Sequence, residues 1–414
     1  RAMTSLYNVR YQLRVHRRDQ LIEFIKGLLT NAFVLSGERR DITQQRYLDI
    51  LANLEDLIDD HRSHVAEGLG GASRLKENVP SIGTFFTPLP LKDAFLELDA
   101  QCHISARIHV PPSFNDVRHV LNRAQVMAIA SRLRLITFDG DQTLYEDQRN
   151  LENPDSDMVN MLVALLEHGV YVAVVTAAGY PNQPERYEAR LTGLLRRFEQ
   201  DRAPEELTSR FFVLGGECNY LIRCTAEYRL AQVPEQQFQT PEILSWPAES
   251  ITQLIQVAKR SLTYSIKTMC LEADVITKER SCGMVPRAGH SFSREQLDEV
   301  CIGARVALKR ENVELPFCAF NGGSDVWVDV GNKLIGVKVL RGYLRCSGDE
   351  TIHYGDQFLS TGNDLSTRTA CTTVWIGNPA ETEDSLRGLL ACLAEHKDAQ
   401  HAKSTSAPAT PAKE

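Results

Sequence analysis

A short apolar run that ends in two acidic residues constrains the fold of this chain most strongly. Leu133–Phe138 is largely apolar and is followed at once by Asp139 and Asp141. A run of this length is typical of a strand that is buried on both faces. A helical pattern comes next, and then a second apolar run, Val170–Thr176. Strand, helix and strand in this order predict a βαβ unit of a parallel sheet.

The patterns on either side of this unit predict an α/β protein with an insertion. Helical periodicity dominates the first hundred residues, and further strands are expected at 211–214, 326–330, 351–354 and 372–376. Between 222 and 320 the pattern changes to two helices with short strand-like stretches. We therefore predict an N-terminal helical region (1–125), an α/β core (126–222 and 321–400), an inserted α+β cap (223–320) and a disordered tail (401–414).

Composition excludes several classes of protein. The formal net charge of −8 argues against a nucleic-acid coat, which needs a basic surface. No apolar run is long enough to span a bilayer, and no secretory signal is visible, so we expect a cytoplasmic protein that binds neither membrane nor nucleic acid. The ten cysteines form no C-x-x-C pair, so we expect reduced thiols buried as small hydrophobic groups.

Polar residues follow the predicted strands at the points where the strands end. In an open parallel sheet, ligands bind beyond the carboxyl ends of the strands. The residues at these positions are Asp139, Asp141 and Thr143, then Thr176, then Lys333, and then Asp356 with Asn363 and Asp364. Each group has an ordinary structural explanation when taken alone, as a solvated loop, a strand end or a turn. Their order along alternating strands favours a shared site.

These side chains supply what attack on a phosphate monoester requires. Asp139 can attack phosphorus and form an aspartyl-phosphate, and Asp141 can protonate the leaving oxygen. Carboxylate oxygens suit Mg²⁺, which draws a carboxylate and a phosphate together despite their like charges. The hydroxyl of Thr176 and the ammonium of Lys333 can hold the phosphoryl oxygens.

The set resembles the four motifs of the haloacid dehalogenase-like superfamily, in the expected order. That resemblance implies a Rossmann-like haloacid dehalogenase core with a parallel sheet, an inserted α+β cap and, here, an N-terminal helical domain. In the superfamily, an aspartate at the position of Asp141 separates phosphatases and mutases from ATPases. The insertion corresponds to the cap of phosphomannomutases and sugar phosphatases, and Gly355–Asp364 resembles the last motif of phosphomannomutase.

A closer resemblance, to the IMP-specific 5′-nucleotidase family, covers nearly the whole chain. The segments that carry it are Tyr7–Leu13, Val110–Asp116, Phe138–Asp147, Gly215–Tyr220, Phe320–Asp329 and His353–Phe358. It implies Mg²⁺-dependent hydrolysis of inosine 5′-monophosphate (IMP) to inosine and phosphate, a homotetramer, and allosteric activation by ATP through the N-terminal helical region. Asn332 departs from the acidic residue that some members carry at this position.

The resemblance also implies roles for individual residues. Asp139 is the nucleophile and Asp141 the general acid and base. Mg²⁺ is held by the Asp139 side chain, the Asp141 backbone carbonyl and Asp356, with Asp364 close behind. Thr176 and Lys333 bind the phosphate.

Other residues have two interpretations each. Asp147 contacts the ribose or is an exposed loop acid, and Asp329 faces the nucleoside or orients Lys333. Glu217 and Asn219 contact the base or sugar, or they join the core to the cap. Three aromatic residues stack on a purine or belong to the core, namely Tyr220, Trp327 and Phe358.

Arg118, His119 and Asn122 lie on the helix that leads into the Asp139 strand, and form a candidate ATP site or a charged surface. Two alternatives to the nucleotidase remain at this stage. One is a phosphosugar phosphatase or a phosphomannomutase-like enzyme that uses the same motifs. The other is a non-catalytic nucleotide-binding regulator, which would be expected to carry a broken motif.

Overall fold

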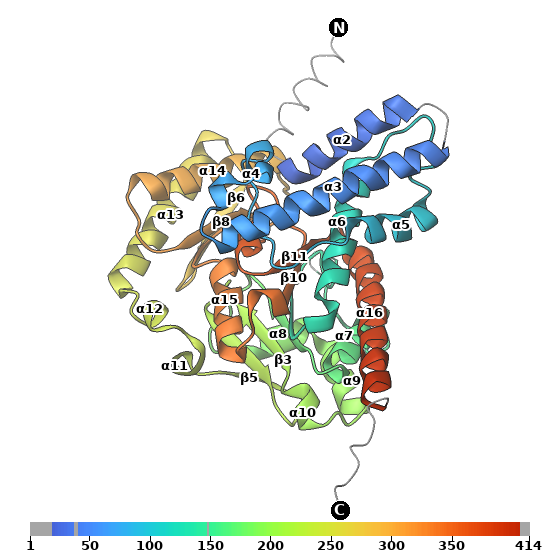
Figure 1. Cartoon of the computed structure of the whole chain (residues 1–414). Coiled ribbons are helices and arrows are strands. Elements are labelled where there is room, and N and C mark those ends of the chain that lie inside the picture. Colours follow the sequence, from blue (N-terminus) through green and yellow to red (C-terminus); the bar gives the residue numbers. More distant parts are fainter. Residues whose placement is uncertain (1–18, 37–39, 147–148, 406–414) are drawn as a thin grey trace, which may run out of the picture.

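The computed structural model describes residues 19–36, 40–146 and 149–405. The N-terminal part contains the helices α2 (Gln20–Ser36), α3 (Arg40–Ala66), α4 (Arg74–Asn78), α5 (Leu91–Cys102) and α6 (Phe114–Ile129). These helices enclose their own apolar core, to which each of the longer ones contributes buried side chains such as Ile25, Leu51, Phe95 and Val120. Helix α6 runs through the expected boundary at residue 125 and leads into the first strand (Figure 1).

The core is a seven-stranded sheet with the order β11-β10-β1-β2-β3-β4-β5. Its strands are β1 (Leu135–Phe138), β2 (Tyr171–Val175), β3 (Phe211–Gly215), β4 (Tyr220–Cys224), β5 (Leu230–Gln232), β10 (Thr351–Gly355) and β11 (Thr372–Trp375). The first five strands in the order are parallel, and β4 and β5 extend the sheet as an antiparallel hairpin. The predicted α/β fold with a parallel sheet is confirmed.

Helices cover both faces of this sheet. They are α7 (Asp157–Glu167), α8 (Pro184–Arg190), α9 (Thr192–Gln200), α10 (Glu205–Thr208), α11 (Glu235–Phe238), α12 (Pro241–Leu244), α15 (Lys333–Leu344) and α16 (Pro379–Thr405). One apolar cluster packs α6, α7, α9 and α16 against the sheet, and a second packs α11, α12 and α15 against the other face. Because both faces are covered, the strands read as continuous apolar runs.

The inserted cap has a sheet of its own, with the order β6-β7-β9-β8. It consists of α13 (Ala248–Thr268), β6 (Ala273–Thr277), β7 (Ser281–Pro286), α14 (Arg294–Arg310), β8 (Phe317–Asn321) and β9 (Val326–Val330). The prediction that 326–330 is a core strand is wrong, because β9 pairs with β7 and β8 in the cap. The hairpin β4–β5 conversely runs past residue 222 within the core sheet, so the boundaries 223–320 do not match the observed pairing.

Two smaller expectations also differ from the structure. Helix α16 continues to Thr405, beyond the residue at which a disordered tail was expected to begin. The cysteines are all free and most are buried, but Cys102 and Cys270 are exposed. Among the described helices, none has the length and apolar character that crossing a bilayer would demand.

Candidate active site

The predicted site residues meet where the sheet reverses its winding direction. Strands β1 and β10 are adjacent and parallel, and the chain continues from them to opposite sides, to β2 and to β11. Such a switch point opens a crevice beyond the carboxyl ends of the strands. Asp139 follows β1 and Asp356 follows β10, while Thr176 follows β2. The backbone N–H of Asp139 donates to the carbonyl of Tyr354, 2.8 Å away, which ties the two strand ends together.

Lys333 reaches this crevice from the first turn of α15. Asn332 caps that helix, since its side-chain oxygen accepts from the N–H of Ile335 at 2.9 Å. The fully buried Lys333 ammonium lies 2.8 Å from Oδ1 of Asp139 and 2.7 Å from Oδ1 of Asp364. Although burial lowers the pKa of Lys333, the carboxylates of Asp139 and Asp364 raise it above its usual value. The ammonium therefore stays charged beside the carboxylate of Asp139.

Asp364 is held from three sides. Besides Lys333, its carboxylate contacts Nε2 of His353 at 3.0 Å and accepts from the N–H of Gln357 at 2.9 Å. Gly355 makes room for it, since a Cβ at 355 would lie 2.4 Å from the Asp364 carboxyl carbon. Burial alone would raise the pKa of Asp364, but Lys333 and His353 hold it well below its usual range. Asp364 is thus a fixed counter-ion for Lys333.

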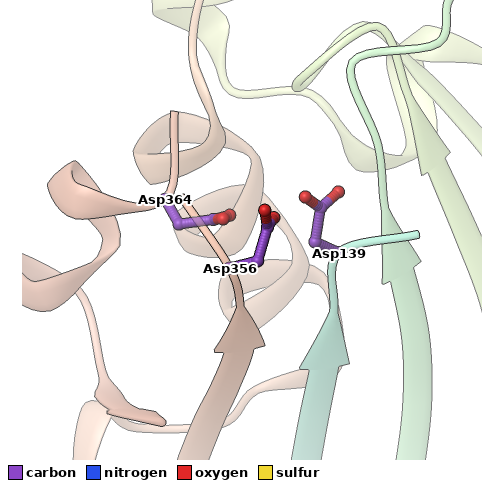
Figure 2. Close-up of side chains that lie close together, drawn as sticks. All are labelled: Asp139, Asp356 and Asp364. Atoms are coloured by element: carbon purple, nitrogen blue, oxygen red, sulfur yellow. The ribbon is translucent and has the colours of Figure 1, made fainter. Parts of the chain in front are cut away.

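Asp139, Asp356 and Asp364 point toward one another from neighbouring segments (Figure 2). Each offers an oxygen within 4.8 Å of the others. Burial raises the pKa of Asp139 to about 7, despite Lys333, and that of Asp356 to about 8, with a further contribution from the Asp139 carboxylate. Three carboxyl groups thus converge on the single ammonium of Lys333, and burial favours the protonated forms of Asp139 and Asp356 when no cation offsets their charge. An all-oxygen donor set of this kind fits a hard divalent cation such as Mg²⁺.

Asp141 lies beside the cluster and is partly exposed. Nη1 of Arg190, the last residue of α8, donates to both of its carboxylate oxygens. The phenol of Tyr145 lies above Gly140, where a Cβ would come within 2.4 Å of its oxygen. The Gly140 position therefore leaves no room for a side chain between the two aspartates.

A cavity of about 510 Å³ opens over these groups. It is lined by Asp139, Asp141, Gln142, Thr176, Ala177, Ala178, Tyr180, Arg190, Lys278, Phe320, Asn321, Gly322, Gly323, Ser324, Asp325, Trp327, Asp356, Gln357 and Asn363. Core and cap both contribute to the wall. Of the aromatic candidates, Trp327 lines the cavity, whereas Tyr220 and Phe358 are buried in the protein. The cavity is large enough for a small phosphorylated ligand.

Several cavity residues were missed by sequence reasoning. Arg190 and Lys278 are the two cations among the described lining residues. Asp325 lines the cavity, while Asp329 lies inside the cap sheet, 1% exposed. The glycine-rich turn before β9 is the one sequence signal that points to Asp325, since such turns bring backbone close to ligands.

Asp329 and Glu217 are buried acids at the junction of core and cap. Neither oxygen of Asp329 accepts a hydrogen bond from a described residue, and burial raises its pKa well above the usual range. Glu217 accepts from Asn363 at 2.9 Å, and burial raises its pKa to about 7. Asn219 joins core to cap, donating to the carbonyl of Val330 at 2.9 Å. Direct contact of these residues with a nucleoside stays a prediction.

Asp147 falls outside the described residues, so its expected ribose contact also stays a prediction. Of the candidate effector residues, Arg118 is buried and forms a bidentate pair with Glu381, at 2.7 and 2.9 Å. The amide side chain of Asn122 donates to the carbonyl of Trp375 and accepts from the N–H of the same residue. His119 is 41% exposed and lies beside Glu381. The Arg118 and Asn122 side chains thus already join α6 to β11 and α16.

Comparison with known proteins extends the resemblance beyond the motifs. A family model described as IMP-specific 5′-nucleotidase matches residues 3–386. The IMP-specific 5′-nucleotidase 1 of Yarrowia lipolytica is 42% identical, with 95% of this chain and 99% of the relative covered. The protein of the same name from Schizosaccharomyces pombe is 40% identical, with 93% and 98% covered.

Solved structures of a relative support the same family assignment. The N-terminally truncated, IMP-bound IMP-nucleotidase of Plasmodium falciparum superimposes with a TM-score of 0.83 at 34% identity, covering 90% of this chain and 96% of that one. The ATP-bound structure of the same enzyme gives 0.82 at 34% identity, covering 93% and 88%. Because the match includes the helical region, the core and the cap together, this chain belongs to the IMP-specific 5′-nucleotidase family and is a phosphoric monoester hydrolase.

Proposed function

We propose that this protein hydrolyses inosine 5′-monophosphate to inosine and phosphate, with Mg²⁺ as cofactor and an aspartyl-phosphate as intermediate. The observation that carries the proposal is the convergence of Asp139 and Asp356 at one cavity, with the buried Lys333 paired to Asp139, although the three come from distant parts of the chain. The choice of IMP as substrate rests on the names of the relatives. The proposed reaction rests on the side chains that line the cavity.

In the first step the Asp139 carboxylate attacks phosphorus, and the bond from phosphorus to the ribose 5′-oxygen breaks. Asp141 gives its proton to that oxygen, so inosine leaves as a neutral alcohol. Water then attacks the phosphorus of the aspartyl-phosphate, and Asp141 takes the proton that water loses. Breaking the phosphorus–Asp139 bond releases phosphate and regenerates the carboxylate.

Thr176 and Lys333 hold the phosphoryl oxygens in both steps. Lys333 is suited to this because its charge is fixed by Asp364 whether or not Asp139 is esterified. In this proposal Mg²⁺ is held by the side chains of Asp139 and Asp356 and by the Asp141 backbone carbonyl. When bound, it would offset the negative charge of the attacking carboxylate and of the phosphate.

The proposal includes activation by ATP and a homotetrameric assembly. A second cavity, of about 420 Å³, lies between α2, α6 and the loops around β11, and Arg118 and Asn122 line it. Asn122 holds Trp375, whose indole N–H donates to the carbonyl of Asp356 at 3.0 Å. A nucleotide bound in this cavity would therefore act on the segment that carries Asp356.

A phosphate-release screen with Mg²⁺ over IMP, GMP, AMP and hexose phosphates tests the substrate. Preference for IMP supports the proposal, and preference for a hexose phosphate contradicts it. Measuring the IMP saturation curve at increasing ATP concentrations tests the regulation. A curve that ATP leaves unchanged would contradict activation by ATP. Light scattering on the purified protein tests the tetramer.

A further inference from the structure

Lys278 lies between two aromatic rings in the wall of the active-site cavity. Its ammonium is 4.6 Å from the ring centroid of Trp327 and 5.4 Å from that of Tyr180. Lys278 comes from the turn between β6 and β7 of the cap, and Tyr180 from the core loop that follows Thr176. All three line the cavity that also contains Asp139. A ligand held by its phosphate at Asp139 would therefore share one cavity with this group.

The indole of Trp327 is fixed by the cap sheet. Trp327 faces Gly283 across the antiparallel pair β7–β9. A Cβ at residue 283 would lie 2.5 Å from the indole ring, so the ring rests directly on the strand backbone. Any larger residue at 283 would push the ring away. A flat aromatic surface held in this manner suits stacking against a nucleobase.

The ammonium of Lys278 has hydrogen-bonding capacity to spare. It carries three donors, and its hydrogen bond to a described residue is a long one, 3.5 Å to the carbonyl of Gly179. It forms no ion pair with any described residue, in contrast to Arg190, the other cation in the lining, which is bound to Asp141. Lys278 can therefore donate to a ligand without giving up a strong bond.

We propose that Lys278 donates hydrogen bonds to the 6-oxo oxygen and N7 of a purine that stacks near Trp327, and so selects 6-oxopurine over 6-aminopurine nucleotides. This inference rests on the proposed nucleotidase function. In a 6-oxopurine, O6 and N7 are neighbouring acceptors on one edge, whereas adenine presents a donor at position 6. An ammonium has only donors, so it can bind O6 and N7 of a 6-oxopurine but is repelled by the amino group of adenine.

The test uses Lys278→Met, which keeps the length and loses the donors, and Lys278→Arg, which keeps charge and donors. Lys309→Met, an exposed lysine on α14 of the cap, is the matched control. The values of kcat/KM are measured for IMP, AMP and p-nitrophenyl phosphate, which has no base. Because hydrogen bonds to charged groups are strong, Lys278→Met is expected to lose about 10- to 100-fold on IMP. AMP and p-nitrophenyl phosphate should change little, Lys278→Arg should recover much of the loss, and Lys309→Met should match wild type.

Equal losses of kcat/KM on all three substrates would overturn the proposal. Such losses would mean that Lys278 acts by joining the cap to the core through its hydrogen bond to Gly179, and not by contacting the base. Wild-type activity of Lys278→Met on IMP would also overturn it. A calorimetric titration with inosine, which lacks the phosphate, separates this inference from the proposed function. If the wild type releases no phosphate from IMP, the proposed function fails, and inosine affinity still decides the base contact. Weaker inosine binding by Lys278→Met supports the contact, and equal binding excludes it.

Discussion

Arg190 holds the carboxylate of Asp141 from the end of α8, with Nη1 at 3.1 Å from one oxygen and 3.3 Å from the other. The contact fixes where the carboxylate of the proposed general acid points. It also joins the loop after β1 to a helix that follows β2. Arg190 is therefore a candidate positioning residue for proton transfer to the leaving group.

Arg190→Gln is expected to lower kcat for IMP by about 10- to 100-fold, because a misplaced acid loses part of its contribution. KM should change less, since the proposed phosphate contacts of Thr176 and Lys333 are left in place. Steady-state kinetics measure both constants. Arg196→Gln, at an exposed position on α9, is the control. A change confined to KM would instead make Arg190 a substrate-binding residue.

Asp139→Asn is expected to abolish phosphate release while the protein stays folded and binds IMP. The amide cannot attack phosphorus, but it has nearly the same shape, and Lys333 keeps its pair with Asp364. Phosphate release, thermal unfolding and IMP calorimetry on the same preparation measure the three properties. Turnover close to wild type would exclude Asp139 as the nucleophile.

Mg²⁺ affinity is expected to rise with pH. Burial raises the pKa of Asp139 to about 7 and that of Asp356 to about 8, so protons occupy these carboxyls at pH 6 and leave as pH rises. Because a cation must displace those protons, the dissociation constant should fall at least about tenfold between pH 6 and pH 8. Calorimetry at pH 7 in two buffers of different ionisation enthalpy should detect proton release on binding. A constant affinity across this range would contradict the raised pKa values of these two carboxyls.

The pair between Arg118 and Glu381 is expected to stabilise the protein in a pH-dependent manner. Burial raises the pKa of Glu381, but His119 and Arg118 outweigh it and hold the pKa well below the usual 4.5. A depressed pKa in the folded state gives stability that is present above pH 4.5 and lost as pH falls toward the folded value.

At pH 7, Glu381→Gln should lower the free energy of unfolding by about 2–4 kcal/mol, since it leaves the buried Arg118 without its counter-charge. The difference from wild type should shrink as pH falls below 4.5. Denaturant unfolding at pH 7 and pH 3.5 measures both values. Glu395→Gln, at an exposed position on the same helix, should change neither. A difference that is the same at both pH values would argue against an ionic contribution.

The sequence by itself determined the parallel strands of the core sheet and the residues at its switch point. Leu135–Phe138 and Tyr171–Val175 are largely apolar, which favours burial on both faces, and parallel strands bring their carboxyl ends to one edge. Asp139, Thr176 and Asp356 therefore had to lie near one another once those strands paired in order. Local pattern was sufficient because each residue directly follows its own strand.

Only the tertiary structure decided which sheet takes Val326–Val330, since an apolar strand fits a core sheet and a cap sheet equally well. The pairing of this strand in the cap sheet buries Asp329 and leaves Asp325 at the cavity. The packing of the elements likewise brings Lys278 to Trp327 and Arg190 to Asp141, contacts that no spacing along the chain encodes. Sequence pattern reports which face of an element is buried, whereas the partner on that face is set by how the elements pack.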